Sequence, residues 1–282
     1  MIAPTVGAND RHLATDRLLD FTMREYSPTF PVTAGALSAA SLLGASLESA
    51  GSGPLRRAIA AVRSGIGRNR TIWAAIDRRG VVSWELYWYN RSNVEAVHLD
   101  QVLHVLDLEH TGRWVLSLPR QPDVFSLDID NALVDDGRLE SVNVYVGNPV
   151  APVPSGYSYR WSEAGPRLSN AYYRFPRSMI ESVRTQLTAA MRVDVVDSLL
   201  WEDISPCDSL HVANKIASDC LYYGGVDAES LITILARCEA HPSIRAHLES
   251  DWDKLRHLRF DVGLDVEIGR SGYSKVAVYG AV

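Results

Sequence analysis

The sequence has little of what marks several large classes of protein. Its formal net charge of −6 leaves no basic excess of the kind that general nucleic-acid or anionic-membrane binders use. The three cysteines, Cys207, Cys220 and Cys238, stand at spacings that fit no zinc or redox motif, which indicates free thiols in a reducing compartment. We therefore predict a cytoplasmic protein that binds neither nucleic acid nor membrane.

Long hydrophobic runs and phosphate-binding glycine motifs are also missing. The most apolar segment, residues 32–50, is interrupted by Ser, Thr and Gly and has no basic flank, so it predicts small-residue helical structure rather than a membrane span. Neither a G-x-G-x-x-G sequence after a strand nor a Walker-type loop occurs. A parallel, nucleotide-binding sheet is therefore not expected.

What the chain does contain is enough apolar sequence for a full core, 46% of 282 residues. The turn sequence AGSGP at 50–54 divides it into an N-terminal helical segment, residues 1–54, and a larger part, residues 55–282. We predict that the first segment packs on a single main domain formed by the second, which begins with a short helix over 55–63.

From residue 71 the sequence alternates between apolar and polar residues, as β-strands do. Five hairpins are predicted: 71–90, 123–130 with 139–147, 155–163 with 167–176, 209–217 with 218–225, and 258–269 with 273–282. The second hairpin should turn at Asp135, Asp136 and Gly137. Between the hairpins, helical spacing occurs over 93–108, 177–191, 228–238 with Asp227 as N-cap, and from Pro242 to Leu255.

The alternation separates two faces in each hairpin, and one of them has an unusual composition. Its members combine charges with tyrosine and include Glu85, Tyr87, Tyr89, Ser126, Asp128, Asp130, Ser141, Asn143, Tyr145, Asp261, Asp265, Glu267, Lys275 and Tyr279. A sheet closed on itself, with helices outside, would turn this face inward around a wet cavity and leave no exposed edge. The alternative is an open sheet with helices on one face and water on the other. We predict an α+β fold of about ten antiparallel strands, in five hairpins, forming a barrel or strongly curved sheet with helices outside.

This rhythm resembles the ABBA, or PT-barrel, family of aromatic prenyltransferases. The segment FSLDIDNALVDDGRLESVNVYVGN, residues 125–148, is similar to the strand pair of that family that carries an acidic residue, a turn and then Asn-x-Tyr. The direct link NPVAPVP, residues 148–154, departs from the family's repeat because no helix separates the second and third hairpins. The resemblance implies transfer of an allyl group from an allylic diphosphate to an aromatic or peptide acceptor in specialised metabolism.

The resemblance also implies three kinds of site residue. A diphosphate donor is compatible with Mg²⁺, but no cofactor is required by the sequence. Basic side chains would bind the diphosphate, tyrosines would shield the allyl cation, and a carboxylate would orient the acceptor or take its proton. The candidate acids are Glu85 and Asp128. The candidate substrate-binding residues are Arg70, Tyr87, Asn143, Tyr145, Arg174 (with Asn170 and Tyr172 on its face), Lys215, Tyr222, Tyr273, Lys275 and Tyr279. No metal site is predicted from the histidines or from the three acids of DNALVDD.

Each candidate also has a purely structural interpretation. Lys275 can pair across strands with Asp265 or Glu267, tyrosine fits any pleated surface, and Asp128 can support a turn. The chain could therefore be a non-catalytic ligand-binding or interaction protein on the same scaffold, or a barrel that catalyses isomerisation or cyclisation. Clustering of at least three basic residues at one rim of a deep cavity would favour allyl transfer. A filled interior would favour the binding protein.

Overall fold

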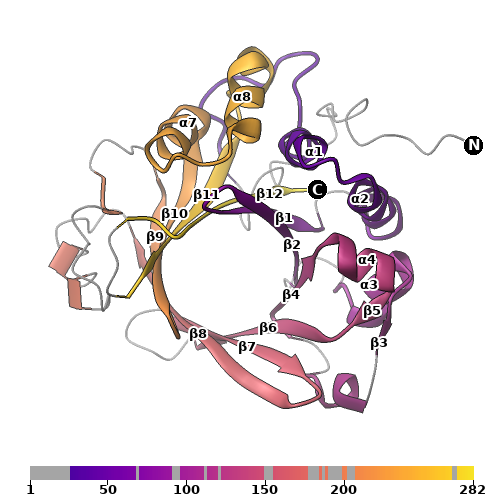
Figure 1. The fold of residues 1–282 in the computed structure, drawn as a ribbon. Helices are drawn as coiled ribbons and strands as arrows, with labels where there is room; N and C mark the ends of the chain where they lie inside the picture. The colour runs from indigo at the N-terminus through magenta and orange to yellow at the C-terminus, as the bar shows by residue number, and fades with distance from the viewer. Residues whose placement is uncertain are drawn as a thin grey trace, which may run out of the picture.

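The computed structural model describes residues 26–282, apart from 68–69, 91–95, 111–112, 120–121, 149–154, 177–183, 186–187, 190–198, 202–206 and 269–271. Ten antiparallel strands form a closed barrel with helices on its outside (Figure 1). The predicted α+β fold is therefore confirmed, and of its two versions the closed barrel is the one observed. None of the helices in the described part of the chain is long and apolar enough to cross a membrane.

The barrel strands follow the predicted segments closely. They are β1 (Ile72–Arg78), β2 (Val81–Tyr89), β4 (Val124–Ile129), β6 (Ser141–Asn148), β7 (Ser155–Ser162), β8 (Gly165–Pro176), β9 (Ser209–Lys215), β10 (Ser218–Asp227), β11 (Arg259–Glu267) and β12 (Lys275–Ala281). Around the barrel they run in the order β1-β12-β11-β10-β9-β8-β7-β6-β4-β2, so the first and last strands close it. At this seam the indole Nε1 of Trp73 donates to the carbonyl of Ala281 at 2.9 Å.

The link between β4 and β6 differs from the predicted tight turn. It contains a short helix, α4 (Asn131–Asp136), and β5 (Arg138–Leu139), which pairs in parallel with β3 (Glu109–His110) outside the barrel. Asp130, expected on the polar face, instead caps α4 by accepting a hydrogen bond from the Leu133 amide at 2.7 Å. Asp136 therefore ends a helix rather than forming a turn. Gly137, at φ +64°, follows it as the left-handed cap.

The outer helices cover the predicted apolar face of the sheet. They are α1 (Ala40–Ser49), α2 (Gly53–Gly65), α3 (Leu99–Leu106), α7 (Ala228–Arg237), α8 (Pro242–Ser250) and α9 (Trp252–Leu255), with a 3₁₀ turn, η1 (Arg113–Ser117). Trp84, Leu86 and Trp88 of β2 are buried in the core beneath them. This core, rather than the lumen, contains most of the apolar residues.

The helix predictions were correct in position and less so in extent. Asp227 caps α7 as predicted, accepting from the Ser230 amide at 2.8 Å. The helix predicted over 55–63 lies within α2, whereas only the second half of 32–50 is helical. The segment from Pro242 to Leu255 is divided at Asp251 into α8 and α9. Most of the helix predicted over 177–191 lies outside the described residues, as do 93–95 of the segment that contains α3.

Candidate functional site

The barrel encloses a cavity of about 640 Å³, which is in the range of small-molecule sites. Nine of the predicted site residues line it: Glu85, Tyr87, Asp128, Asn143, Tyr145, Lys215, Tyr222, Lys275 and Tyr279. They come from six strands that are dispersed in sequence between residues 81 and 281. The inward face was therefore correctly identified by period-two alternation alone.

Three predicted residues do not line the cavity. The guanidinium of Arg70 lies before β1 and donates to the carbonyl of Ile66 at 3.3 Å. Arg174 is exposed and lies two residues beyond Tyr172 along β8, opposite His211. The ring of Tyr273 packs edge-on against that of Trp201, with 5.9 Å between the ring centroids. Strand β12 begins only at Lys275, so the alternation of inward and outward side chains does not extend back to residue 273. The structure therefore does not bring these three residues together with the other nine.

Five tyrosines form a closed ring inside the barrel, which we call the tyrosine ring. Its members are Tyr87 of β2, Tyr145 of β6, Tyr172 of β8, Tyr222 of β10 and Tyr279 of β12, one from every second strand. Each aromatic centroid lies 5.7–6.4 Å from the next, and the last returns to the first. A pentagon with such sides has its centre about 5 Å from each ring, within the reach of a cation–π interaction.

Small residues on the intervening strands make room for this ring. Each one is the cross-strand partner of one tyrosine: Ala74 of Tyr279, Ser126 of Tyr87, Ser158 of Tyr145, Ala213 of Tyr172 and Gly263 of Tyr222. At Gly263 the fit is tightest, because a Cβ atom there would lie 2.7 Å from Cε1 of Tyr222. The alternation of large and small side chains therefore continues around the whole barrel.

Burial raises the pKa of every phenol in the tyrosine ring. The effect is largest for Tyr87, Tyr145, Tyr222 and Tyr279, and neighbouring acidic and phenolic groups add to it. The pKa of Tyr172 is raised less, because Lys215 and hydrogen bonds oppose the effect of burial. The ring therefore presents five neutral phenols at physiological pH.

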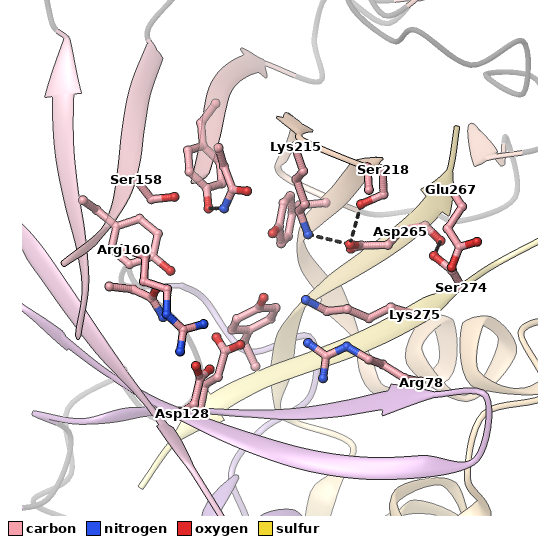
Figure 2. Close-up of a pocket in the computed structure, with 18 of the residues that line it drawn as sticks. Arg78, Asp128, Ser158, Arg160, Lys215, Ser218, Asp265, Glu267, Ser274 and Lys275 are labelled. Carbon is pink, nitrogen blue, oxygen red and sulfur yellow. Dashed lines mark hydrogen bonds and ion pairs between the residues drawn. The ribbon is translucent and has the colours of Figure 1, made fainter. Parts of the chain in front are cut away.

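A layer of charged side chains faces the same cavity (Figure 2). Its cations are Arg78, Arg160, Lys215 and Lys275, and its acids are Glu85, Asp128, Asp265 and Glu267. Lys215 Nζ lies 2.6 Å from Asp265 Oδ2, and both side chains are largely buried. The pKa of Asp265 is lowered, since Lys215 and Lys275 together outweigh the effect of burial. This pair is fully charged and structural in character.

The other three cations are differently placed. Arg78 donates to the Ser83 hydroxyl and Arg160 to the Ser141 hydroxyl, each at 3.0 Å. Lys275 has no hydrogen bond or ion pair to any residue that the structure describes, and neither arginine has an ion pair within that part of the chain. In Figure 2, Arg78 and Lys275 point into the cavity from one side and Arg160 from the other. Three cationic groups are thus available to a ligand.

Glu85 and Asp128 form a carboxyl pair across β2 and β4, where they are direct cross-strand partners. The hydroxyl of Tyr87 donates to Glu85 Oε2, which fixes that carboxylate above the tyrosine ring. Burial, followed by the charge of Glu85 and a hydrogen bond with it, raises the pKa of Asp128 to about 6, although Arg160 and Arg78 oppose this. A carboxyl group with such a pKa can exchange protons near neutral pH.

Several cavity residues were missed in the analysis of the sequence. Arg78 follows Ala74 and Ile76 at period two on β1, and Arg160 follows Ser158 on β7, so alternation could have identified both. Tyr172 was considered only as a neighbour of Arg174. Within the described residues, no three His, Cys, Asp or Glu side chains are grouped so that they could hold a metal ion.

A second cavity of about 540 Å³ adjoins the first and shares Asp128 and Arg160 as lining residues. Its other walls come from the α4 and β5 link, including Leu133, Arg138 and Leu139. In comparisons with known proteins, the chain matches no protein-family model and no curated protein.

Proposed function

We propose that this protein transfers an allyl group from an allylic diphosphate to an aromatic or peptide acceptor. The observation that supports this most directly is the tyrosine ring beneath Arg78, Arg160 and Lys275. Ionisation of an allylic diphosphate produces one anion and one carbocation. The cavity offers cationic groups for the first and π faces for the second.

Three cationic side chains of the cavity remain for a diphosphate once the internal ion pairs are considered. Lys215 is neutralised by Asp265, and Glu267 is paired with Arg79 at 3.6 Å. Arg78 and Arg160 then supply two positive charges for the diphosphate, and Lys275 adds a third when it is protonated. The Glu85 and Asp128 carboxyl groups of the same layer offset part of this charge. The guanidinium groups can bind phosphate oxygens in a bidentate way, and Lys275 acts as a point charge.

In this reaction the C–O bond of the donor breaks, the diphosphate leaves with the electron pair, and the allyl cation remains above the tyrosine ring. Because the phenols are neutral, they stabilise the cation through their π faces and do not capture it as phenolates. The acceptor attacks the cation and loses a proton. The Glu85–Asp128 pair is suited to take it, because both residues line the first cavity and Asp128 also lines the second.

The decisive experiment is calorimetric titration with dimethylallyl thiodiphosphate and its geranyl analogue, with and without Mg²⁺. Lys275→Gln should weaken binding about tenfold or more, because it removes a charge-assisted contact. Lys254→Gln is the matched control, since Lys254 lies outside the barrel on α9, paired with Asp251, and its loss should leave binding unchanged.

Turnover is tested separately by release of inorganic diphosphate from dimethylallyl diphosphate, since water can capture the cation when no acceptor is supplied. Release that is lost in Lys275→Gln and kept in Lys254→Gln would support allyl transfer. Absence of saturable binding for either donor would contradict the proposal. Tight binding without release, in the presence of an acceptor panel, would instead support the non-catalytic ligand-binding protein.

A further inference from the structure

Lysine is scarce in this chain and concentrated in the cavity. The sequence has three lysines against 25 arginines. Two of the three, Lys215 and Lys275, line the cavity inside the barrel. The third, Lys254, is 55% exposed on α9 and pairs with Asp251 at 2.6 Å. Because arginine supplies nearly all other positive charge, a property of lysine that arginine lacks is relevant here, namely an amine that can lose its proton and act as a nucleophile.

The two lysines of the cavity have opposite environments. Burial alone would lower the pKa of Lys215, but Cys220 and the contacting carboxylate of Asp265 raise it. The pKa of Lys275 is lowered, chiefly by burial and then by the positive charge of Lys215. When the environments of two like groups shift their pKa values in opposite directions, one group is typically the reactive one and the other supports it.

Charged and titratable groups face Lys275 from each neighbouring element. Lys215 of β9 is cationic and opposes its protonation, while Glu85 of β2, Asp265 of β11 and Cys220 of β10 favour it. Arg78 of β1 points into the same space. Both acids are already engaged by other residues: Asp265 by Lys215, and Glu85 by the hydroxyl of Tyr87. Burial and the positive charge of Lys215 therefore outweigh these acids, and the pKa of Lys275 is lowered.

We propose that Lys275 is a nucleophilic amine that captures small carbonyl compounds bearing a phosphate or carboxylate group, as an imine within the barrel. Three observations carry this: the amine points into a cavity of about 640 Å³, it has no ion pair among the described residues, and Arg78 and Arg160 face the same space. The two guanidinium groups select an anionic ligand, and the amine selects its carbonyl carbon.

The chemistry is complete without an oxidant or reductant. The nitrogen lone pair attacks the carbonyl carbon, and a proton transfer to the carbonyl oxygen gives a carbinolamine. Loss of this oxygen as water then leaves the C=N bond, with a net change of amine and carbonyl to imine and water. The Glu85–Asp128 pair faces this space and can supply and recover the proton, as the raised pKa of Asp128 allows.

The test uses pyridoxal 5′-phosphate as a probe that combines an aldehyde with a phosphate, followed by cyanoborohydride to trap the imine. The full-length protein is labelled at pH 7, digested, and the modification at each amine is quantified by mass spectrometry. Lys275 should be labelled at least fivefold faster than Lys254, although Lys254 is the more exposed of the two. Lys275→Arg should remove this label and leave the labelling of Lys254 unchanged.

Two further measurements separate a built site from an accidental reactive amine. Arg78→Gln should slow labelling of Lys275 by pyridoxal 5′-phosphate severalfold but leave labelling by pyridoxal, which lacks the phosphate, within twofold. Labelling of Lys275 no faster than that of Lys254 in the wild-type chain overturns the proposal, whether or not the variants fold. No allylic donor is present, so this outcome is independent of the test of allyl transfer.

Discussion

Asp128 is a cavity acid whose pKa lies close to neutral pH. Its pKa is raised to about 6 from an ordinary value near 4, by burial and then by Glu85. The folded state therefore holds this proton more tightly than the unfolded chain does. Between about pH 4 and 6 the folded protein binds more protons, so the stability contributed by this group falls as the pH rises.

We therefore expect the free energy of unfolding of the wild-type protein to fall, relative to that of Asp128→Asn, as the pH is raised from 4 to 6. The amide cannot ionise, so the variant lacks this source of pH dependence. Urea unfolding at several pH values measures the difference. The exposed acid Asp253 provides the control, since Asp253→Asn should follow the wild-type profile. Parallel curves for wild type and Asp128→Asn would show that burial and Glu85 do not raise the pKa of Asp128 as described.

At the scale of secondary structure elements, the sequence predicts a strand or helix well where its formation depends on residues close in sequence. Alternation identified all ten barrel strands and nine of the side chains that line the cavity, although Arg78 and Arg160 were missed. It failed at the β4–β6 link, where Asp130 and Gly137 were available as the two caps of a helix. Asp130 was instead assigned to the polar face of a strand, and Gly137 to a turn. A helix of six residues, Asn131–Asp136, is too short to show a hydrophobic period, so capping chemistry was the only signal for it.

Helix α7 provides a direct test of capping chemistry at this scale. Asp227 satisfies the Ser230 amide, so Asp227→Ala should lower the free energy of unfolding by about 1 kcal/mol. Asp227→Asn keeps an acceptor and should recover most of the loss. Glu229→Gln, in the first turn of the same helix, changes a charge without removing a cap. It should lower the free energy of unfolding by no more than a few tenths of a kcal/mol. Equal losses in the Ala and Asn variants would contradict the capping role.

At the scale of the whole molecule, the tyrosine ring could not be predicted, because it depends on how distant strands align. Each tyrosine was assigned an inward direction or an inward neighbour from its own strand. That five of them meet at one level follows from the stagger of ten strands, which appears only when β1 and β12 pair. The need for a small residue beside each tyrosine, such as Gly263 beside Tyr222, becomes evident only once the strands are paired in that register.

Closure of the barrel thus brings the residues of the site together. The seam where β1 pairs with β12 can be tested by substitution. Trp73 is fully buried, and its indole joins β1 to the carbonyl of Ala281 at 2.9 Å. Gly280 accommodates the indole, because a Cβ atom there would lie 2.7 Å from Cζ2 of Trp73. Trp84, also buried, instead donates to the Ser46 hydroxyl of α1 at 3.0 Å. The two residues lose the same atoms on substitution by phenylalanine, but only one of them is at the seam.

We expect Trp73→Phe and Trp84→Phe each to lower the free energy of unfolding by about 2 kcal/mol, since each removes a buried hydrogen bond and packed volume. Amide hydrogen exchange should distinguish them. In Trp73→Phe, the amides of β1 and β12 should exchange faster relative to those of β9 and β10, because opening begins where the last strand meets the first. In Trp84→Phe this ratio should remain that of the wild type. A uniform acceleration in both variants would mean that the barrel opens as one unit, with no weak seam, and that the tyrosine ring is lost only by global unfolding.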